Sequence, residues 1–329
     1  MRRTILLFAL ILASTAQAQA LKDPQWAGWL DVGQTESLEK AAQARLASRP
    51  DDVQALAALA LAQGDRLDNA RLDAGVRTAE SCIAKHADQA ICYYALGSVQ
   101  SLQALSGGAM KAISLAGKVK SNLQRALELD PTLFEARMGL VQFYLRVPGM
   151  VGGSVPKARE LADDLNSRQP EQARLLRAMV AANDKNWAEE ERELRAVKPG
   201  DDLPLKFAVR EAWGQLGTDL MWAKQPDKAR EIFNALQRDW PKHALGYYGM
   251  GRVEASLGHQ DEAIRLYEKA ATLDGADKLP IDHRLGQALA DKGDKTGAQR
   301  ALERFVANKR SNPANVKDAR KLLEELGQG

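Results

Sequence analysis

The feature that most constrains how this chain folds is a repeat of about 34 residues in its C-terminal half. Glycine recurs at Gly217, Gly251 and Gly286, which are 34 (251 − 217) and 35 (286 − 251) residues apart. Alanine recurs at the same intervals, at Ala229, Ala263 and Ala298. A constant period of this length is typical of a row of similar units, each packed on its neighbours. We therefore expect an extended array rather than one or two globular domains.

The most complete unit runs from Arg210 to Pro241 and follows the pattern W-x2-L-G-x2-L…A-x3-F…P. Its signature positions are Trp213, Leu216, Gly217, Leu220, Ala229, Phe233 and Pro241. The next two units carry Tyr247, Met250, Gly251, Gly258, Ala263, Tyr267 and Ala270, and then Leu285, Gly286, Gly293, Ala298 and Leu302. This pattern resembles the tetratricopeptide repeat, with leucine at position 220 where tyrosine is usual. The resemblance implies an all-α solenoid of antiparallel helix pairs with a concave inner surface.

The signature has a physical cause. Small residues such as Gly217 and Ala229 are expected where two helices approach closely, because a larger side chain would push the backbones apart. Large residues such as Trp213, Phe233 and Tyr267 are expected to fill the gaps between successive pairs. One pair alone cannot bury its apolar face, so the units are stable only when they stack.

The repeat pattern divides the chain into five segments. These are a cleaved signal peptide (1–20), an N-terminal segment with a first helix (21–50), divergent repeats (51–204), three signature units (205–311), and a capping helix with a tail (312–329). Two divergent units are about ten residues longer than the period, and we expect both to be stretched at the turn between their two helices. The last segment is amphipathic after Pro313, which suits a cap over the open apolar end of the array.

The N-terminus has the features of a secretory signal. Met1-Arg2-Arg3 is a short basic region, Thr4–Ala13 is apolar but too short to span a bilayer, and A-x-A cleavage sites end at Ala18 and Ala20. We expect export to the periplasm, the alternative being an N-terminal membrane anchor. Loss of the two arginines lowers the formal charge from +3 to +1 (3 − 2), which favours neither nucleic acid nor membrane insertion or anionic lipid.

The chain contains two cysteines, Cys82 and Cys92, separated by nine residues. One lies late in a predicted helix and the other lies early in the next, so a tight turn can bring them together. An oxidising compartment then favours a disulfide, the alternative being two buried free thiols. No further cysteine is available for a zinc cluster, and the histidines (His86, His243, His259 and His283) are scattered. We expect no metal and no cofactor.

A glycine-rich heptapeptide, P-G-M-V-G-G-S at residues 148–154, interrupts the helical pattern. Its simplest interpretation is an elongated turn in which Ser154 caps the next helix and Pro156 lies in its first turn. The alternative is an anion site of glycine amides at a helix N-terminus, although no Gly-Lys-Ser/Thr follows as in a nucleotide P-loop. A second glycine turn stands at residues 106–108. We expect the two turns to be neighbours on one edge of the solenoid and to form a partner-binding patch of Gly107, Gly108, Gly149, Gly152, Gly153 and Ser154.

The same insert carries a second resemblance. The pattern P-G-x-x-G-G-S followed by K-A, and preceded by A-L-E-L-D-P and the pair Phe143-Tyr144, resembles a group of exported bacterial tetratricopeptide proteins. The likeness covers roughly residues 90–170. It implies the fold and the compartment, and it brings no biochemical activity with it.

A concave groove is the expected binding surface, because the first helix of each pair lines it in tetratricopeptide proteins. At this phasing the groove-facing residues are Tyr94, Phe143, Tyr144, Trp222, Tyr248, Arg252 and His283. Aromatic residues and arginine are frequent anchors for peptide segments, and the alternative is that these residues pack between helices. The Lys and Asn residues of the carboxylate-clamp version are absent, because Tyr94, Ser98 and Tyr248 stand at such positions. Trp26 and Trp29 either cover the end of the first helices or bind a partner.

The sequence offers little for catalysis, since it has no H-E-x-x-H, G-x-S-x-G, C-x-x-C or dinucleotide fingerprint. The acidic pairs at 51–52, 163–164 and 201–202 suit helix ends, and the charged run at 188–195 suits an exposed helix face. We predict a non-enzymatic scaffold of the cell envelope that binds other proteins or peptide segments. The alternatives are a periplasmic enzyme on the same scaffold, with His283, Arg252 and Glu254 as its site, and a purely structural spacer.

Overall fold

The structure is a computed structural model that describes residues 19–65, 68–308 and 311–327. The expected signal peptide falls outside these residues except for Gln19 and Ala20. Within them the secondary structure is helical, with no strand and a single β-bridge between His243 and Asp274. The all-α prediction is therefore confirmed. None of the described helices combines the length and the apolar character needed to cross a membrane.

The helices follow one another along the chain with short connections. Their bounds are α1 (Pro24–Val32), α2 (Thr35–Ser48), α3 (Val53–Gly64), α4 (Asn69–Lys85), α5 (Ala90–Ser106), α6 (Gly108–Leu129), α7 (Phe134–Arg146), η1 (Gly149–Val151), α8 (Val155–Asp163), α9 (Pro170–Asn183), α10 (Trp187–Ala196), α11 (Leu203–Trp222), α12 (Pro226–Asp239), α13 (Ala244–Ser256), α14 (Gln260–Ala270), η2 (Ala276–Lys278), α15 (Ile281–Lys292), α16 (Lys295–Ala307) and α17 (Pro313–Gly327). The elements η1 and η2 are short 3-10 helices.

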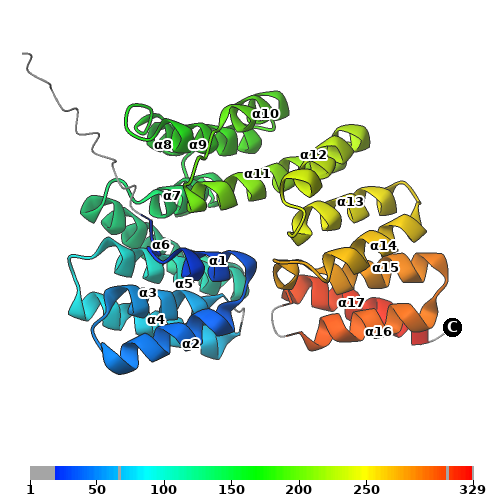
Figure 1. Ribbon diagram of the computed structural model, residues 1–329, viewed down its shortest axis with the longest axis horizontal. Coiled ribbons are helices and arrows are strands. Elements are labelled where there is room, and N and C mark those ends of the chain that lie inside the picture. Colours follow the sequence, from blue (N-terminus) through cyan, green and yellow to red (C-terminus); the bar gives the residue numbers. More distant parts are fainter. Residues whose placement is uncertain (1–18, 66–67, 309–310, 328–329) are drawn as a thin grey trace, which may run out of the picture.

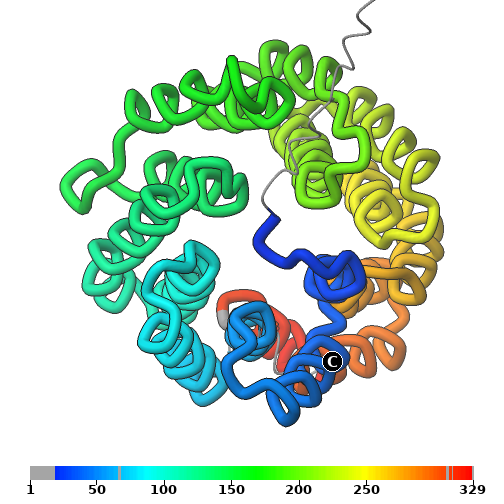
Figure 2. Tube along the Cα trace, turned by 60° about the vertical axis from the view of Figure 1, so that its left-hand side comes forward, coloured from blue at the N-terminus to red at the C-terminus, as the bar shows by residue number. Residues whose placement is uncertain are grey.

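From α3 onward the helices form antiparallel pairs, beginning with α3 and α4 and ending with α15 and α16, and α17 packs on the last pair (Figure 1). The first helix of each pair also contacts the first helix of the next pair. The first helices thus form a continuous inner row, and the pairs curve around an inner space (Figure 2). This arrangement is the superhelix that stacked units produce when each is rotated by a constant amount.

The hydrophobic core follows the array as successive clusters, one centred on the first units, one spanning α6 to α13 and one in α13 to α16. Phe233 shows how the repeat builds this core. Its ring is 1% exposed and lies between Gly217 of its own unit and Gly249 of the next. A Cβ atom on Gly217 would lie 2.7 Å from that ring, which real structures do not tolerate. The close approach of the helices therefore requires glycine here.

The same pairing recurs in the following units. Gly251 faces Tyr267, at 2.7 Å from a hypothetical Cβ atom, and Gly286 faces Leu302, at 2.6 Å. In all three units the large residue follows the glycine by 16 positions (233 − 217, 267 − 251 and 302 − 286). The volumes expected from the repeat signature are therefore present in the packing.

Helix ends use the acidic residues that the sequence placed there. Asp52 accepts a hydrogen bond from the amide of Ala55 at 2.9 Å, and Asp202 accepts one from the amide of Leu205 at 3.0 Å. Asp163 is the last residue of α8. Asp52 and Asp202 thus satisfy amides at helix N-termini that have no partner within the helix, whereas Asp163 lies at a C-terminal end. The prediction that the acidic pairs lie at helix ends is confirmed.

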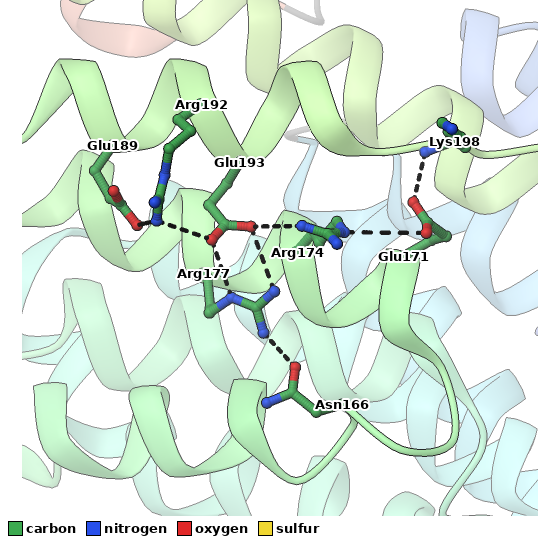
Figure 3. A network of polar contacts seen from close by, with 8 residues as sticks. All are labelled: Asn166, Glu171, Arg174, Arg177, Glu189, Arg192, Glu193 and Lys198. Atoms are coloured by element: carbon green, nitrogen blue, oxygen red, sulfur yellow. Dashed lines mark hydrogen bonds and ion pairs between the residues drawn. The ribbon is translucent and has the colours of Figure 1, made fainter.

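The structure corrects the expectation that the charged run at 188–195 forms an exposed helix face. Glu190 and Glu193 are only 2% and 7% exposed. Glu193 on α10 lies 3.3 Å from Arg177 and 3.7 Å from Arg174, both on α9 (Figure 3). These ion pairs tie the two helices of one unit together. The alternating charges are therefore partly interhelical, which a pattern within one helix does not reveal.

The structure also corrects the expected shape of the unit before the heptapeptide. We expected a long glycine turn at residues 106–108, but only Gly107 separates α5 from α6. The additional residues lengthen the helices instead, to 17 residues in α5 and 22 in α6. A helix can absorb an insertion in this way when both partners extend together and continue to bury a common face.

The heptapeptide itself is an ordered, elongated turn. Gly152 has a φ of +108°, in the left-handed region that favours glycine. The hydroxyl of Ser154 accepts a hydrogen bond from the amide of Lys157 at 3.4 Å and so caps α8, while Pro156 lies in the first turn. The amide of Ser154 donates to the carbonyl of Tyr144 at 2.9 Å. These bonds account for the turn as the simplest interpretation anticipated.

The two cysteines are joined in a disulfide, with their Cα atoms 5.4 Å apart. Cys82 lies near the end of α4 and Cys92 near the start of α5. Both side chains are fully buried beside Leu56. The disulfide therefore links the second helix of one unit to the first helix of the next.

Candidate functional site: the C-terminal groove

A groove of about 490 Å³ opens on the inner surface where α11, α13, α15 and α17 lie side by side. We call it the C-terminal groove. It is lined by Met221, Trp222, Arg252, Ala255, Ser256, Tyr267, Arg284, Gln287, Ala288, Ala290, Asp291, Asp318, Lys321, Leu322 and Glu325. The lining comes from the first helices of three successive units and from the capping helix, apart from Tyr267, which lies on α14. The repeat therefore builds the groove by presenting equivalent positions at regular intervals.

An exposed aromatic residue and an arginine form one wall of the groove. Trp222, the last residue of α11, is 69% exposed. The guanidinium of Arg252 lies 5.8 Å from the centre of the Trp222 ring and 5.8 Å from that of the Tyr248 ring. Arg252 also donates a hydrogen bond to the hydroxyl of Thr218 at 3.3 Å. These contacts hold the guanidinium between two rings and leave a large apolar surface of Trp222 in solvent.

The opposite wall carries charges of both signs. Arg284 on α15 donates to Gln287 at 2.8 Å, and Gln287 donates to Asp318 on α17 at 3.0 Å. Lys321 lies 3.5 Å from Glu325, one turn further along α17. Such a wall can pair with either charge in a bound segment and has no strong preference for an acidic or a basic one.

Two of the seven residues expected in the groove, Trp222 and Arg252, line it. Tyr248 is 6% exposed and packs against Tyr267 directly beneath Arg252. Phe143 and Tyr144 are buried in the central core cluster, so the packing alternative describes them. Tyr94 is half-buried between the first two clusters, and burial raises the pKa of its hydroxyl.

His283 does not face the groove. Its ring is 1% exposed, stacks on Phe305 at 5.0 Å between ring centres, and lies 2.8 Å from a carboxylate oxygen of Asp318. Burial lowers the pKa of His283, although the hydrogen bond to Asp318 acts in the opposite direction. The residue thus fastens the capping helix to the last pair.

The three residues of the enzyme alternative do not converge. Burial of Glu254 opposes ionisation, but hydrogen bonds from His259 and Arg230 outweigh it and hold the pKa of this carboxyl below its usual value. Those bonds measure 2.8 Å each and direct Glu254 toward α12 and the start of α14. Arg252 points into the groove and His283 is enclosed by α16 and α17. Each of the three side chains is therefore bound to different partners: Arg252 to Thr218, Glu254 to Arg230 and His259, and His283 to Asp318.

The two glycine turns also lie apart. The turn at 148–154 packs against the body of α6, where a Cβ atom on Gly152 would lie 3.5 Å from the ammonium group of Lys120. Gly108 is the first residue of the same helix, 12 residues earlier (120 − 108), or about 18 Å along its axis. Lengthening of α5 and α6, rather than of their turn, is what separates the two glycine turns.

Sequence reasoning missed an occupied part of the inner surface. Residues 20–33 run inside the superhelix and contact α3, α7 and α11 as well as α2. Asp31 forms an ion pair with Arg210, 179 residues away. Trp26 is 4% exposed, and the Arg45 guanidinium lies 3.9 Å from the centre of its ring, so Trp26 serves packing. These contacts lie outside the repeat pattern, so no spacing in the sequence signals them.

Comparison with known proteins supports the fold. Residues 244–277, which contain α13 and α14, match the family model of the tetratricopeptide repeat. A tetratricopeptide repeat protein from Parabacteroides merdae is similar with a TM-score of 0.51 and 16% identity, over 80% of this chain and 96% of that chain. No curated protein matches this chain in sequence.

Two further structures are more distant. The Cut9–Hcn1 hetero-tetramer of APC/C has a TM-score of 0.48 and 13% identity, over 91% of this chain and 54% of that chain. The pilF protein of Pseudomonas aeruginosa has a TM-score of 0.43 and 18% identity, over 66% of this chain and 90% of that chain.

The helix pairs, their period and the first of these structural matches define the class. The protein is a tetratricopeptide-repeat solenoid, as the repeat signature predicted. Solenoids of this class generally act in protein–protein interaction through extended concave surfaces.

Proposed function

We propose that this protein is a non-enzymatic scaffold that binds a segment of another protein in the C-terminal groove. The observation that carries the proposal is Trp222, a 69% exposed aromatic side chain beside Arg252 on a concave surface. Tryptophan and arginine are enriched among the residues that dominate binding energy at protein interfaces. The apolar face of Trp222 that Arg252 leaves in solvent, on a concave surface, is the kind of anchor that a bound segment covers.

The groove specifies the chemistry of its partner. An apolar side chain would pack on Trp222, and residues on either side would pair with Arg284 and Lys321 or with Asp291 and Glu325. The first helices are rigid, so the surface is preformed and binding orders mainly the partner. We propose an extended or helical segment with one central apolar anchor.

The cell envelope is the proposed setting. The basic, apolar and A-x-A regions at residues 1–20 support export, and the disulfide between Cys82 and Cys92 suits an oxidising compartment. The turn at 148–154 offers a second surface, since Met150 in η1 is 94% exposed. The groove is favoured over this surface because only the groove combines concave shape with an aromatic–arginine wall.

The test compares capture of envelope proteins by four forms of the mature chain. Wild type, Trp222→Ala, Arg252→Ala and Met150→Ala are immobilised at equal density, and bound proteins are quantified by mass spectrometry. The account predicts a set of proteins that bind wild type and Met150→Ala equally and are lost from both groove variants. Loss confined to Met150→Ala would assign binding to the glycine turns instead, and equal recovery from all four forms would reject the groove.

A further inference from the structure

The inner surface holds a segment of the chain itself. Residues 20–33, which we call the N-terminal arm, lie inside the ring of helix pairs (Figure 2). The arm consists of an extended stretch followed by α1, which ends at Val32 and is capped by Gly33 with a φ of +79°. It touches early and late units at once, a pattern of contacts that nearest-neighbour stacking does not produce.

The extended stretch is held through its backbone. The amide of Ala20 donates to a carboxyl oxygen of Glu135 on α7 at 2.9 Å. The Gln54 side chain on α3 donates to the carbonyl of Ala20 at 3.2 Å and accepts from the amide of Lys22 at 2.9 Å. Ala20 and Leu21 are only 4% and 3% exposed. Backbone recognition of this kind is how grooves bind extended peptides.

The helical part of the arm is held by charge. Arg210 in the middle of α11 donates two hydrogen bonds to Asp31, at 2.7 and 3.1 Å. The two side chains are 4% and 10% exposed. Lys278 in η2 donates to the carbonyl of Leu30 at 2.6 Å and lies 3.8 Å from Asp65 at the end of α3. A cation at the last carbonyls of a helix is favourable, so Lys278 suits the C-terminal end of α1.

A buried histidine, His243, lies near Arg210 and Lys278 but carries no charge. Burial lowers the pKa of His243 to about 4, and the positive charge of Arg210 acts in the same direction. His243 therefore stays neutral at physiological pH. Three cations contact the arm. Arg210 binds the carboxylate of Asp31, Lys278 binds the carbonyl of Leu30, and Arg45 lies 3.5 Å from the carboxylate of Asp23.

We propose that the inner face of α3, α7, α11 and η2 is a peptide-binding site for an acidic, tryptophan-containing helical segment, and that the N-terminal arm is its internal ligand. With the arm bound, early and late units are joined through one segment and the superhelix is held closed. A detached arm frees both the site and the ends of the array. None of the residues that hold the arm lines the C-terminal groove, and this site does not depend on the function proposed for that groove.

The first test measures how tightly the arm is held in the chain that begins at Gln19, the product of cleavage at the first A-x-A site, which retains Ala20. Asp31→Asn breaks the buried ion pair with Arg210. Asp23→Asn is the matched control, because asparagine also caps a helix and the 3.5 Å pair of Asp23 with Arg45 is partly exposed and contributes little. Amide hydrogen exchange is followed for α1, with α14 as internal reference. We expect Asp31→Asn to speed exchange of α1 at least a hundredfold and to leave α14 unchanged, while Asp23→Asn has little effect. Equal exchange of α1 in all three chains would overturn the proposal.

The second test separates a binding site from a merely structural segment. A fluorescent peptide of residues 19–34 is titrated, by anisotropy, into full-length wild type and full-length Asp31→Asn. We expect saturable binding to Asp31→Asn only, since the intact arm excludes the peptide from wild type. A peptide that itself carries Asp31→Asn should bind at least a hundredfold more weakly. Failure of the wild-type peptide to bind the folded Asp31→Asn chain, or equal binding of both peptides, would refute the assignment.

Discussion

The packing of Phe233 between two glycines gives a prediction of defined sign and size. A Cβ atom added at Gly249 would overlap the Phe233 ring, and the ring cannot retreat because Gly217 already lies in contact with its other face. Overpacking of a tight core costs roughly 1–3 kcal/mol, and this case belongs at the upper end. Alanine in place of glycine within a helix returns about 1 kcal/mol. We therefore expect Gly249→Ala to destabilise the protein by about 2 kcal/mol.

A double-mutant cycle isolates this contact. In a Phe233→Leu background the ring is gone, so Gly249→Ala should be neutral or stabilising by up to about 1 kcal/mol. The expected coupling between the two positions is thus about 2–3 kcal/mol. The matched control is Gly117→Ala in α6, where nothing lies within 4 Å of the added methyl group, and it should stabilise by about 0.5–1 kcal/mol.

The assay is urea denaturation followed by far-ultraviolet circular dichroism, with the disulfide kept oxidised in every variant. The two glycine variants carry the same chemical change and must shift the midpoint in opposite directions. If Gly249→Ala is as stable as Gly117→Ala, the helices do not approach at the glycines and the argument from repeat volumes is wrong. A coupling energy near zero would lead to the same conclusion.

Three further predictions follow from buried groups and from the groove. Burial raises the pKa of Glu135 to about 7 and that of Glu190 to about 8. The folded protein is therefore most stable at acidic pH, where both carboxyls are neutral, and it loses stability as pH rises through these values. The free energy of unfolding should fall between pH 5 and 8, on the order of 3 kcal/mol for Glu135 alone, and Glu135→Gln should flatten the profile. Reduction of the disulfide between Cys82 and Cys92 should cost about 3 kcal/mol, as expected for a loop of this length, and shift the urea midpoint accordingly. Trp222→Ala should change stability by less than about 0.5 kcal/mol while weakening partner binding about thirtyfold or more, measured by denaturation and by calorimetry.

Much of the fold could be predicted because each unit repeats the same helix–helix contact. A glycine and a large residue 16 positions later report on one helix–helix contact, so three units in phase identify the period and the partner positions. Only two residues of the groove could be predicted from the sequence. Trp222 and Arg252 follow from the phase of the first helices, whereas Phe143 and Tyr144 occupy similar sequence positions but are buried by α8 and α9.

The parts that the sequence did not reveal depend on contacts without a period. The ion pair of Asp31 with Arg210 joins residues 179 positions apart, and neither residue carries a motif for the other. Glu193 looks solvated within its own helix and is buried only because α9 supplies two arginines. The phase of the repeat predicts His283 in the groove. In the structure the capping helix, which has no repeat signature, places Asp318 against it instead.

The most direct test of the account is whether a partner binds on the concave face at Trp222. The mature chain is labelled with 5-fluorotryptophan, the Trp222 signal is assigned by Trp222→Phe, and fluorine NMR spectra are recorded as a captured partner is added. The account predicts that the Trp222 resonance shifts in proportion to binding while that of the buried Trp26 stays in place. Saturation of the partner with an unchanged Trp222 resonance would contradict it.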